Sequence, residues 1–221
     1  MKRIIAVLTG VVLCIPVAWA EPSSEVAFDV ATVKLLREAD PTRGEVLAKE
    51  GKCAKCHGDA GVSDDSDDVN IAGMRSSYLF KQLKDYQNKS RDDRDMFKKT
   101  RNLDDQQLAD LSAWYASLVP SQSATDQTTD AATLKLIFHG DPKRLLKACA
   151  SCHGWRGRGG QFDHPALAGQ FPQYLIDTMT EFKEGDRSND IYARMRDVAE
   201  SLTEEEIENL ARYYGAALPA E

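Results

Sequence analysis

Two short segments of this 221-residue chain carry closely spaced cysteine and histidine side chains, at residues 53–57 (CAKCH) and 149–153 (CASCH). Two thiols with two residues between them, on one helical turn, match the separation of the haem vinyl groups to which they add covalently. The histidine that follows then lies beneath the iron and becomes its proximal ligand. The sequence therefore predicts two c-type haems. Their attachment residues and proximal ligands are Cys53, Cys56, Cys149, Cys152, His57 and His153.

Cysteine pairs with this spacing also occur in redox-active C-x-x-C sites and in zinc sites. The four cysteines and two histidines of the motifs are enough ligands for zinc. The motif, however, occurs twice, and each copy is followed by a glycine, Gly58 or Gly154. A zinc site also does not explain the methionines that recur at matching positions after each motif. The haem interpretation is therefore favoured.

The first twenty residues have the features of a secretory signal peptide. Two basic residues, at positions 2 and 3, precede an apolar run at residues 4–17, and residues 18–20 (AWA) form an A-x-A cleavage site. The apolar run is too short for a transmembrane helix and is interrupted by a proline. We therefore expect residues 1–20 to be cleaved and the mature chain to lie in the periplasm.

Charge and cysteine usage limit the function further. Beyond residue 20 the chain keeps four cysteines, all within the two motifs, so no disulfide framework is expected even in an oxidising compartment. The same residues carry 26 basic and 35 acidic side chains, a net charge of −9. Such a charge argues against binding to nucleic acid. A mature length of roughly 200 residues suits two domains of about 100 residues each.

The chain contains an internal repeat. A shift of 96 residues superposes the two motifs, residues 71–73 (IAG) on residues 167–169 (LAG), and Tyr78 on Tyr174. After a three-residue insertion in the second half, a shift of 99 residues pairs Met96 with Met195 and continues into the last predicted helix. A repeat of this length indicates a duplicated domain.

The repeat divides the chain into segments. Residues 120–130 are rich in Ser, Gln, Thr, Ala and Asp and have no apolar period, so we expect them to form an exposed linker. The expected organisation is a signal peptide at residues 1–20, a first domain at 21–119, the linker at 120–130 and a second domain at 131–221.

Each half is expected to consist of helices, because no segment alternates polar and apolar residues as a strand would. Asp40 and Asp141 are each followed by proline, which predicts helices that begin there and run into the haem motifs. Capping boxes at Asp104 and Thr203 predict the start of the last helix of each half. Further helices are expected at residues 29–36, 76–87 and 130–138, and at the counterpart of 76–87. The predicted fold class is all-α.

A six-coordinate haem iron needs a second axial ligand, and methionine in that position raises the reduction potential. Of the four methionines beyond residue 20, only Met96 and Met195 correspond under the repeat, and both have polar neighbours in the sequence. Met74 and Met179 have no methionine counterpart and are expected to pack in the core. Met96 and Met195 are therefore the predicted sixth ligands.

The order of these features resembles class I cytochrome c. Each half has C-x-x-C-H-G, then Ile-Ala-Gly or Leu-Ala-Gly, then Tyr-Leu, then a methionine ahead of the capped last helix. Two such domains behind a signal peptide resemble the di-haem cytochrome c4 group, which implies two His/Met haems packed as a pseudo-symmetric pair. One departure is Val69, which stands where the family often has proline, as at Pro165. Its backbone carbonyl is still able to orient the proximal histidine.

The resemblance implies a periplasmic protein that carries single electrons between respiratory partners. A quinol-oxidising complex is the expected donor and a terminal oxidase or reductase the expected acceptor, although no residue selects either. Two alternatives remain at this point. One is a peroxidase-like di-haem enzyme with one five-coordinate iron, and the other is a cytochrome subunit of a larger membrane complex. Peripheral association with a membrane is also open.

Overall fold

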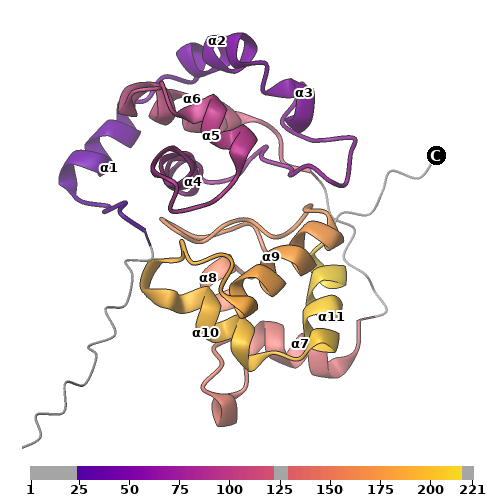
Figure 1. Ribbon diagram of the computed structural model, residues 1–221. Coiled ribbons are helices and arrows are strands. Elements are labelled where there is room, and N and C mark those ends of the chain that lie inside the picture. The colour runs from indigo at the N-terminus through magenta and orange to yellow at the C-terminus, as the bar shows by residue number, and fades with distance from the viewer. Residues whose placement is uncertain (1–23, 122–128, 216–221) are drawn as a thin grey trace, which may run out of the picture.

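The computed structural model describes residues 24–121 and 129–215. The expected signal peptide and most of the expected linker lie outside the described residues. Within the described ranges the regular structure is helical, with two isolated β-bridges and no strand. Figure 1 shows the two halves stacked on each other, the first in indigo and magenta and the second in orange and yellow. The predicted all-α class is confirmed.

The first half is organised around its last helix. Its elements are α1 (Val30–Arg37), α2 (Pro41–Gly51), α3 (Ala54–His57), α4 (Ser76–Asn88), α5 (Arg94–Thr100) and α6 (Asp105–Ser117). Helix α6 packs against α1, α2 and α4. It begins with the predicted capping box, in which Asp104 accepts a hydrogen bond from the backbone of Gln107 and the Gln107 side chain accepts one from the backbone of Asp104.

The second half repeats this arrangement with differences near its start. Its elements are α7 (Ala131–Phe138), the 3₁₀ turn η1 (Pro142–Arg144), α8 (Ala150–His153), α9 (Pro172–Glu184), the 3₁₀ turn η2 (Ile191–Ala193), α10 (Arg194–Ser201) and α11 (Glu204–Tyr214). Helix α9 packs against α10 and α11. The predicted capping box of Thr203 with Glu206 begins α11.

The prediction that a helix runs from Asp141 into the second motif is wrong. Asp141 caps only the single turn η1, which ends at Leu145 in the left-handed region with φ 58°. The backbones of Asp141 and Leu146 then exchange two hydrogen bonds of 2.8 and 3.0 Å, which close the segment into a loop. Arg144 holds this loop against α11 through a bidentate contact with Glu206, at 2.8 and 2.9 Å. In the first half α2 continues to Gly51 as predicted.

Helices α2 and α6 approach each other closely at Gly44. A Cβ atom on Gly44 would lie 2.0 Å from the backbone oxygen of Asp110 and 2.8 Å from Cβ of Trp114. The Asp110 side chain fixes the same contact, because it accepts hydrogen bonds from the Asp40 backbone at 2.7 Å and from Arg43 at 2.6 Å. Only glycine therefore allows this crossing.

We expect Gly44→Ala to lower the free energy of unfolding by about 2 kcal/mol or more, because the methyl group must push two helical backbones apart. Chemical denaturation of the haem-loaded protein, followed by far-ultraviolet circular dichroism, measures the change. Glu45→Ala is the control, since the side chain of Glu45 forms an exposed pair with Lys49, and its effect should stay within about 0.5 kcal/mol. A Gly44→Ala protein as stable as this control would contradict the close approach.

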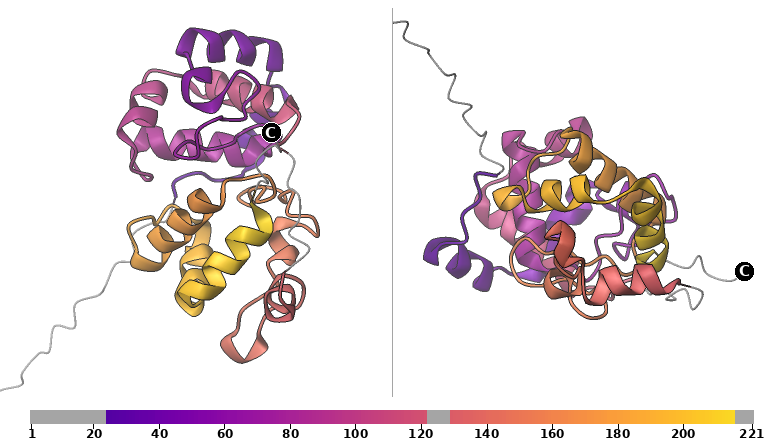
Figure 2. Two further views of the ribbon diagram at one scale, coloured as in Figure 1. Left: turned by 90° about the vertical axis from the view of Figure 1, so that its right-hand side faces the viewer. Right: turned by 90° about the horizontal axis from the view of Figure 1, so that it is seen from below.

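The two halves meet through α4 and the segments around α9 and η2, as two further views show (Figure 2). Asn70 and Gln170 form a reciprocal pair there. The Asn70 backbone donates to the Gln170 side chain at 3.0 Å, and the Gln170 side chain donates to the Asn70 carbonyl at 2.9 Å. Both residues are buried, so this contact fixes one half against the other.

A second interface contact is ionic. Lys81 of α4 is 1% exposed and lies 2.8 Å from Asp85 of the same helix and 3.3 Å from Asp163 of the second half. Lys81 Nζ also donates a hydrogen bond to the backbone carbonyl of Asn189, while the Asn189 side chain donates to Asp85 at 2.7 Å. One buried cation thus joins three segments of the chain.

Candidate haem sites

Each motif forms a short helix that ends at its glycine. Gly58 and Gly154 follow the histidines with φ of 70° and 81°. A Cβ atom on Gly58 would lie 1.9 Å from the backbone oxygen of Val62. The glycine that follows each motif is therefore required by a positive φ and, in the first half, by a close backbone contact.

Both motif histidines are oriented in the same way. Nδ1 of His57 lies 3.0 Å from the carbonyl oxygen of Val69, and Nδ1 of His153 lies 2.9 Å from that of Pro165. A carbonyl only accepts, so Nδ1 carries a proton in both rings, and Nε2 is the nitrogen left to bind a metal. The Val69 carbonyl thus takes the place of the proline carbonyl, as the sequence predicts. Burial lowers the pKa of His153 to about 4, which keeps it neutral.

One cavity of about 1070 Å³ reaches all the predicted site residues. It is lined from both halves and includes Cys53, Cys56, His57, Met96, Cys149, Cys152, His153 and Met195. The sequence assigned these residues to two separate sites. The structure brings the two sites together across the interface, in one continuous space.

All four methionines beyond residue 20 line this cavity, but in two different ways. Met74 is 7% exposed and belongs to the hydrophobic cluster of the first half, and Met179 packs against the cluster of the second half. Met96 and Met195 belong to neither cluster and are half-buried. Packing in the core therefore accounts for Met74 and Met179 only.

The backbones of Met96 and Met195 are each held by an aspartate that precedes the methionine, three residues before it in the first half and five in the second. The amide of Met96 donates to Asp93 Oδ1 at 2.7 Å, and the amide of Met195 donates to Asp190 Oδ2 at 2.8 Å. Each carboxylate holds the first turn of the helix that carries the methionine, α5 in one half and α10 in the other.

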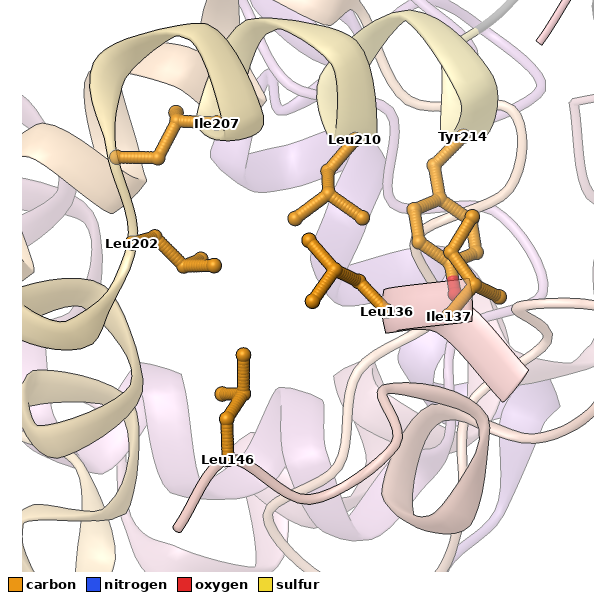
Figure 3. Packing of buried hydrophobic residues seen from close by; sticks show 7 residues of the cluster. All are labelled: Leu136, Ile137, Leu146, Leu202, Ile207, Leu210 and Tyr214. Carbon is orange, nitrogen blue, oxygen red and sulfur yellow. The ribbon is translucent and has the colours of Figure 1, made fainter. Parts of the chain in front are cut away.

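Apolar side chains form much of the remaining wall. Figure 3 shows Leu202, Ile207 and Leu210 around one open space in the second half, with Tyr214 at its side. These four residues also line the cavity. Among the described buried side-chain N and O atoms, the hydroxyl of Tyr214 is the one without a hydrogen-bond partner. Its counterpart Tyr115 lies against the thiol of Cys53.

Two arginines, the buried Arg187 and the half-buried Arg91, add positive charge at the interface end of the cavity. Arg91 donates to Gln82 at 2.9 Å and to the Tyr174 hydroxyl at 3.1 Å. Arg187 donates to Gln82 at 3.1 Å and to Asn189 at 2.9 Å. In the described part of the chain neither arginine forms an ion pair with a carboxylate, although buried guanidinium groups are usually paired with one.

These features together fit a haem. The cavity offers covalent attachment points, two histidines whose Nε2 is left to bind iron, walls that are largely apolar and two unpaired cations that would balance the haem carboxylates. The sequence interpretation missed Arg91 and Arg187. The sequence does indicate them, because the repeat shift of 96 residues places one arginine on the other.

In residues 24–121 and 129–215 no group of three or more His, Cys, Asp or Glu side chains is arranged to hold a metal ion. Across the same ranges, no helix combines the length and apolar character needed to cross a membrane.

The family model for cytochrome c matches the chain twice, at residues 41–118 and 142–214. Cytochrome c4 of Thiocapsa roseopersicina is 33% identical over 79% of this chain and 91% of its own length. The thiosulfate dehydrogenase electron acceptor of Thiomonas intermedia is 29% identical over 85% of this chain and 88% of its own.

A solved structure shares the fold. The crystal structure of reduced recombinant cytochrome c4 from Pseudomonas stutzeri superposes with a TM-score of 0.74 at 30% identity, over 80% of this chain and 97% of that one. The predicted duplication, the two covalently bound haem c groups and the electron-transfer role are confirmed by these comparisons. The chain therefore belongs to the cytochrome c family and, within it, to the di-haem cytochrome c4 group.

Proposed function

We propose that the mature protein is a periplasmic carrier of single electrons with two six-coordinate haems. His57 and Met96 would hold the first haem iron, and His153 and Met195 would hold the second. The bound haem supplies a one-electron couple, and His/Met ligation gives that couple a high potential. The protein contributes a fixed ligand set and an apolar cavity around it.

The observation that carries this proposal is the equivalent placement of Met96 and Met195. Both line the cavity that holds the motif histidines, both lie outside the hydrophobic clusters, and both have their amides held by an aspartate. With an iron ligand on each side in both halves, neither iron keeps an open position for a substrate. An electron carrier is therefore favoured over a peroxidase-like enzyme.

The redox partners are proposed from the family resemblance and from the names of similar proteins. The family resemblance points to a quinol-oxidising complex as donor and to a terminal oxidase or reductase as acceptor. The relatives called thiosulfate dehydrogenase electron acceptors make thiosulfate dehydrogenase a second candidate donor. A place as a permanent subunit of a membrane complex is the alternative to a freely diffusing carrier.

Stopped-flow reduction of the oxidised haem-loaded protein tests this function. We expect either donor, supplied with its own substrate, to reduce both haems, and the protein supplied with ascorbate as reductant to leave hydrogen peroxide unconsumed. Steady reduction of hydrogen peroxide at the expense of ascorbate would instead support the enzyme. Cell fractionation tests the compartment. The periplasmic fraction should contain the protein, whereas recovery only from detergent-solubilised membranes would support a permanent subunit of a membrane complex.

A further inference from the structure

A second cavity lies on the surface where the two halves meet. Its volume is about 540 Å³, and it is separate in position from the motif cysteines. Its lining includes Arg75 from the first half, Pro120 at the end of that half, and Trp155, Arg156 and Arg158 from the second half. We call this the arginine groove.

The charge of the arginine groove is one-sided. Arg75, Arg156 and Arg158 are exposed, and none of them forms an ion pair or a side-chain hydrogen bond in the described part of the chain. Among residues 24–121 and 129–215, no acidic side chain lines the groove. The whole chain has a net charge of −7, whereas this concave surface carries three unpaired positive charges. Such a surface is complementary to an acidic one.

An aromatic side chain lies among these cations. Trp155 is 71% exposed, and its ring stacks at 4.4 Å, centroid to centroid, on that of Phe138, which also lines the groove. A large exposed aromatic ring held in place by a neighbour loses little side-chain entropy when it is covered. Tryptophan and arginine are the residue types that most often dominate protein–protein binding energy.

The groove also lies close to one haem ligand along the chain. Trp155 follows His153 by two residues, and both flank Gly154 at the end of α8. A protein covering Trp155 therefore contacts the same short segment that carries the proximal ligand of the second haem.

The first half cannot form an equivalent surface. Under the repeat shift of 96 residues, Trp155, Arg156 and Arg158 correspond to Asp59, Ala60 and Val62, and Arg75 corresponds to Phe171. The groove is thus a property of one end of the molecule, and a partner that recognises it distinguishes the second haem from the first.

We propose that the arginine groove is the docking surface for a redox partner protein with an acidic face, whose carboxylates contact Arg75, Arg156 and Arg158 and whose surface covers Trp155. This proposal rests on the proposed function, because it names the partner chemistry of an electron carrier. The charged contacts speed association and set its orientation, and Trp155 contributes contact area near the second haem.

Nuclear magnetic resonance of the reduced haem-loaded protein, residues 21–221, tests this docking with hexaglutamate as the acidic probe. These residues contain only two tryptophans, Trp114 and Trp155, so the two indole N–H signals report on two separate places. We expect hexaglutamate to shift the Trp155 signal and leave the Trp114 signal unchanged. The shift should disappear at about 0.5 M salt, where surface charges are screened.

Two matched variants locate the binding. Combined Arg75→Gln, Arg156→Gln and Arg158→Gln should raise the apparent dissociation constant by about tenfold. Combined Arg37→Gln, Arg101→Gln and Lys143→Gln removes the same charge from exposed residues that line neither cavity and should leave the Trp155 shift within about twofold of the original. An unchanged Trp155 signal on addition of hexaglutamate, or a loss of binding in this control variant instead, would overturn the proposal.

A third variant separates a partner from the chain itself. The protein shortened after Gly215 should bind hexaglutamate as the longer protein does. Binding that appears only after shortening would mean that the last residues of this chain occupy the groove, and the partner assignment would be wrong. Binding is read without electron transfer, so the two proposals fail separately. Normal Trp155 binding in a protein that turns over peroxide would overturn the carrier function alone.

Discussion

Replacing Met195 with histidine is expected to lower the reduction potential of one haem and to leave the other near its original value. Methionine raises the potential relative to histidine, and axial ligands span roughly 0.8 V across haem proteins, so a shift of a sizeable part of that range is expected. Spectroelectrochemical titration of the haem-loaded protein resolves the two couples. Met96→His should move the couple that Met195→His leaves in place.

The control variants are Met74→Leu and Met179→Leu. Both methionines line the same cavity but belong to or pack against hydrophobic clusters, and leucine has a similar volume. Both couples should stay near their original potentials in these variants. A large fall in potential for Met179→Leu, together with unchanged couples in Met195→His, would show that the wrong methionine has been assigned.

Lys81→Met is expected to cause the largest loss of stability. Lys81 is 1% exposed and its removal leaves the buried carboxylates of Asp85 and Asp163 without their cation. Breaking a buried ion pair on one side typically costs about 3–5 kcal/mol. Urea denaturation of the oxidised protein, followed by haem absorbance and circular dichroism, measures the loss. Lys84→Met is the control, because its pair with the exposed Asp105 is worth about 0–1 kcal/mol.

The stability deficit of Lys81→Met should depend on pH. Burial raises the pKa of Asp163, and Lys81 opposes that rise, so removing Lys81 raises this pKa further. A carboxyl group with a raised pKa stabilises the folded state while it is protonated and destabilises it as the pH rises through that pKa. The deficit should therefore be smaller at about pH 5 than at about pH 7. An equal deficit at both values would contradict the assigned role of Lys81.

The helical frame was predictable because its signals are local. Asp104 and Thr203 cap the last helices through side chains three residues apart, and such boxes are read directly from the sequence. Because of the duplication, each helix signal occurs twice in the sequence, and Met96 and Met195 are the methionines that occupy matching positions. The failure came where local signals were equal: Asp40 and Asp141 both precede proline, but only the first begins a full helix. The helix that begins after Asp141 stops after one turn, because Leu145 adopts the left-handed conformation and Arg144 contacts Glu206 of α11.

The interface could not be predicted in the same way. Lys81 and Asp85 correspond under the repeat to Asp177 and Glu181, so the duplication gives no reason to group them. Their role as a buried ion pair depends on contacts with Asp163 and Asn189, which are brought to α4 only when the halves dock. The partner of a buried charge is set by tertiary structure, and no short-range pattern in the sequence encodes it.

In the proposed electron carrier each haem iron has a methionine ligand and no open position. Near-infrared absorption of the oxidised protein, with haem counting and addition of carbon monoxide to the reduced protein, tests this ligation most directly. We expect two haems per chain, a methionine-to-iron band with the intensity of two centres, and no rapid carbon monoxide binding. A band of half that intensity, with carbon monoxide binding rapidly to one haem, would contradict it.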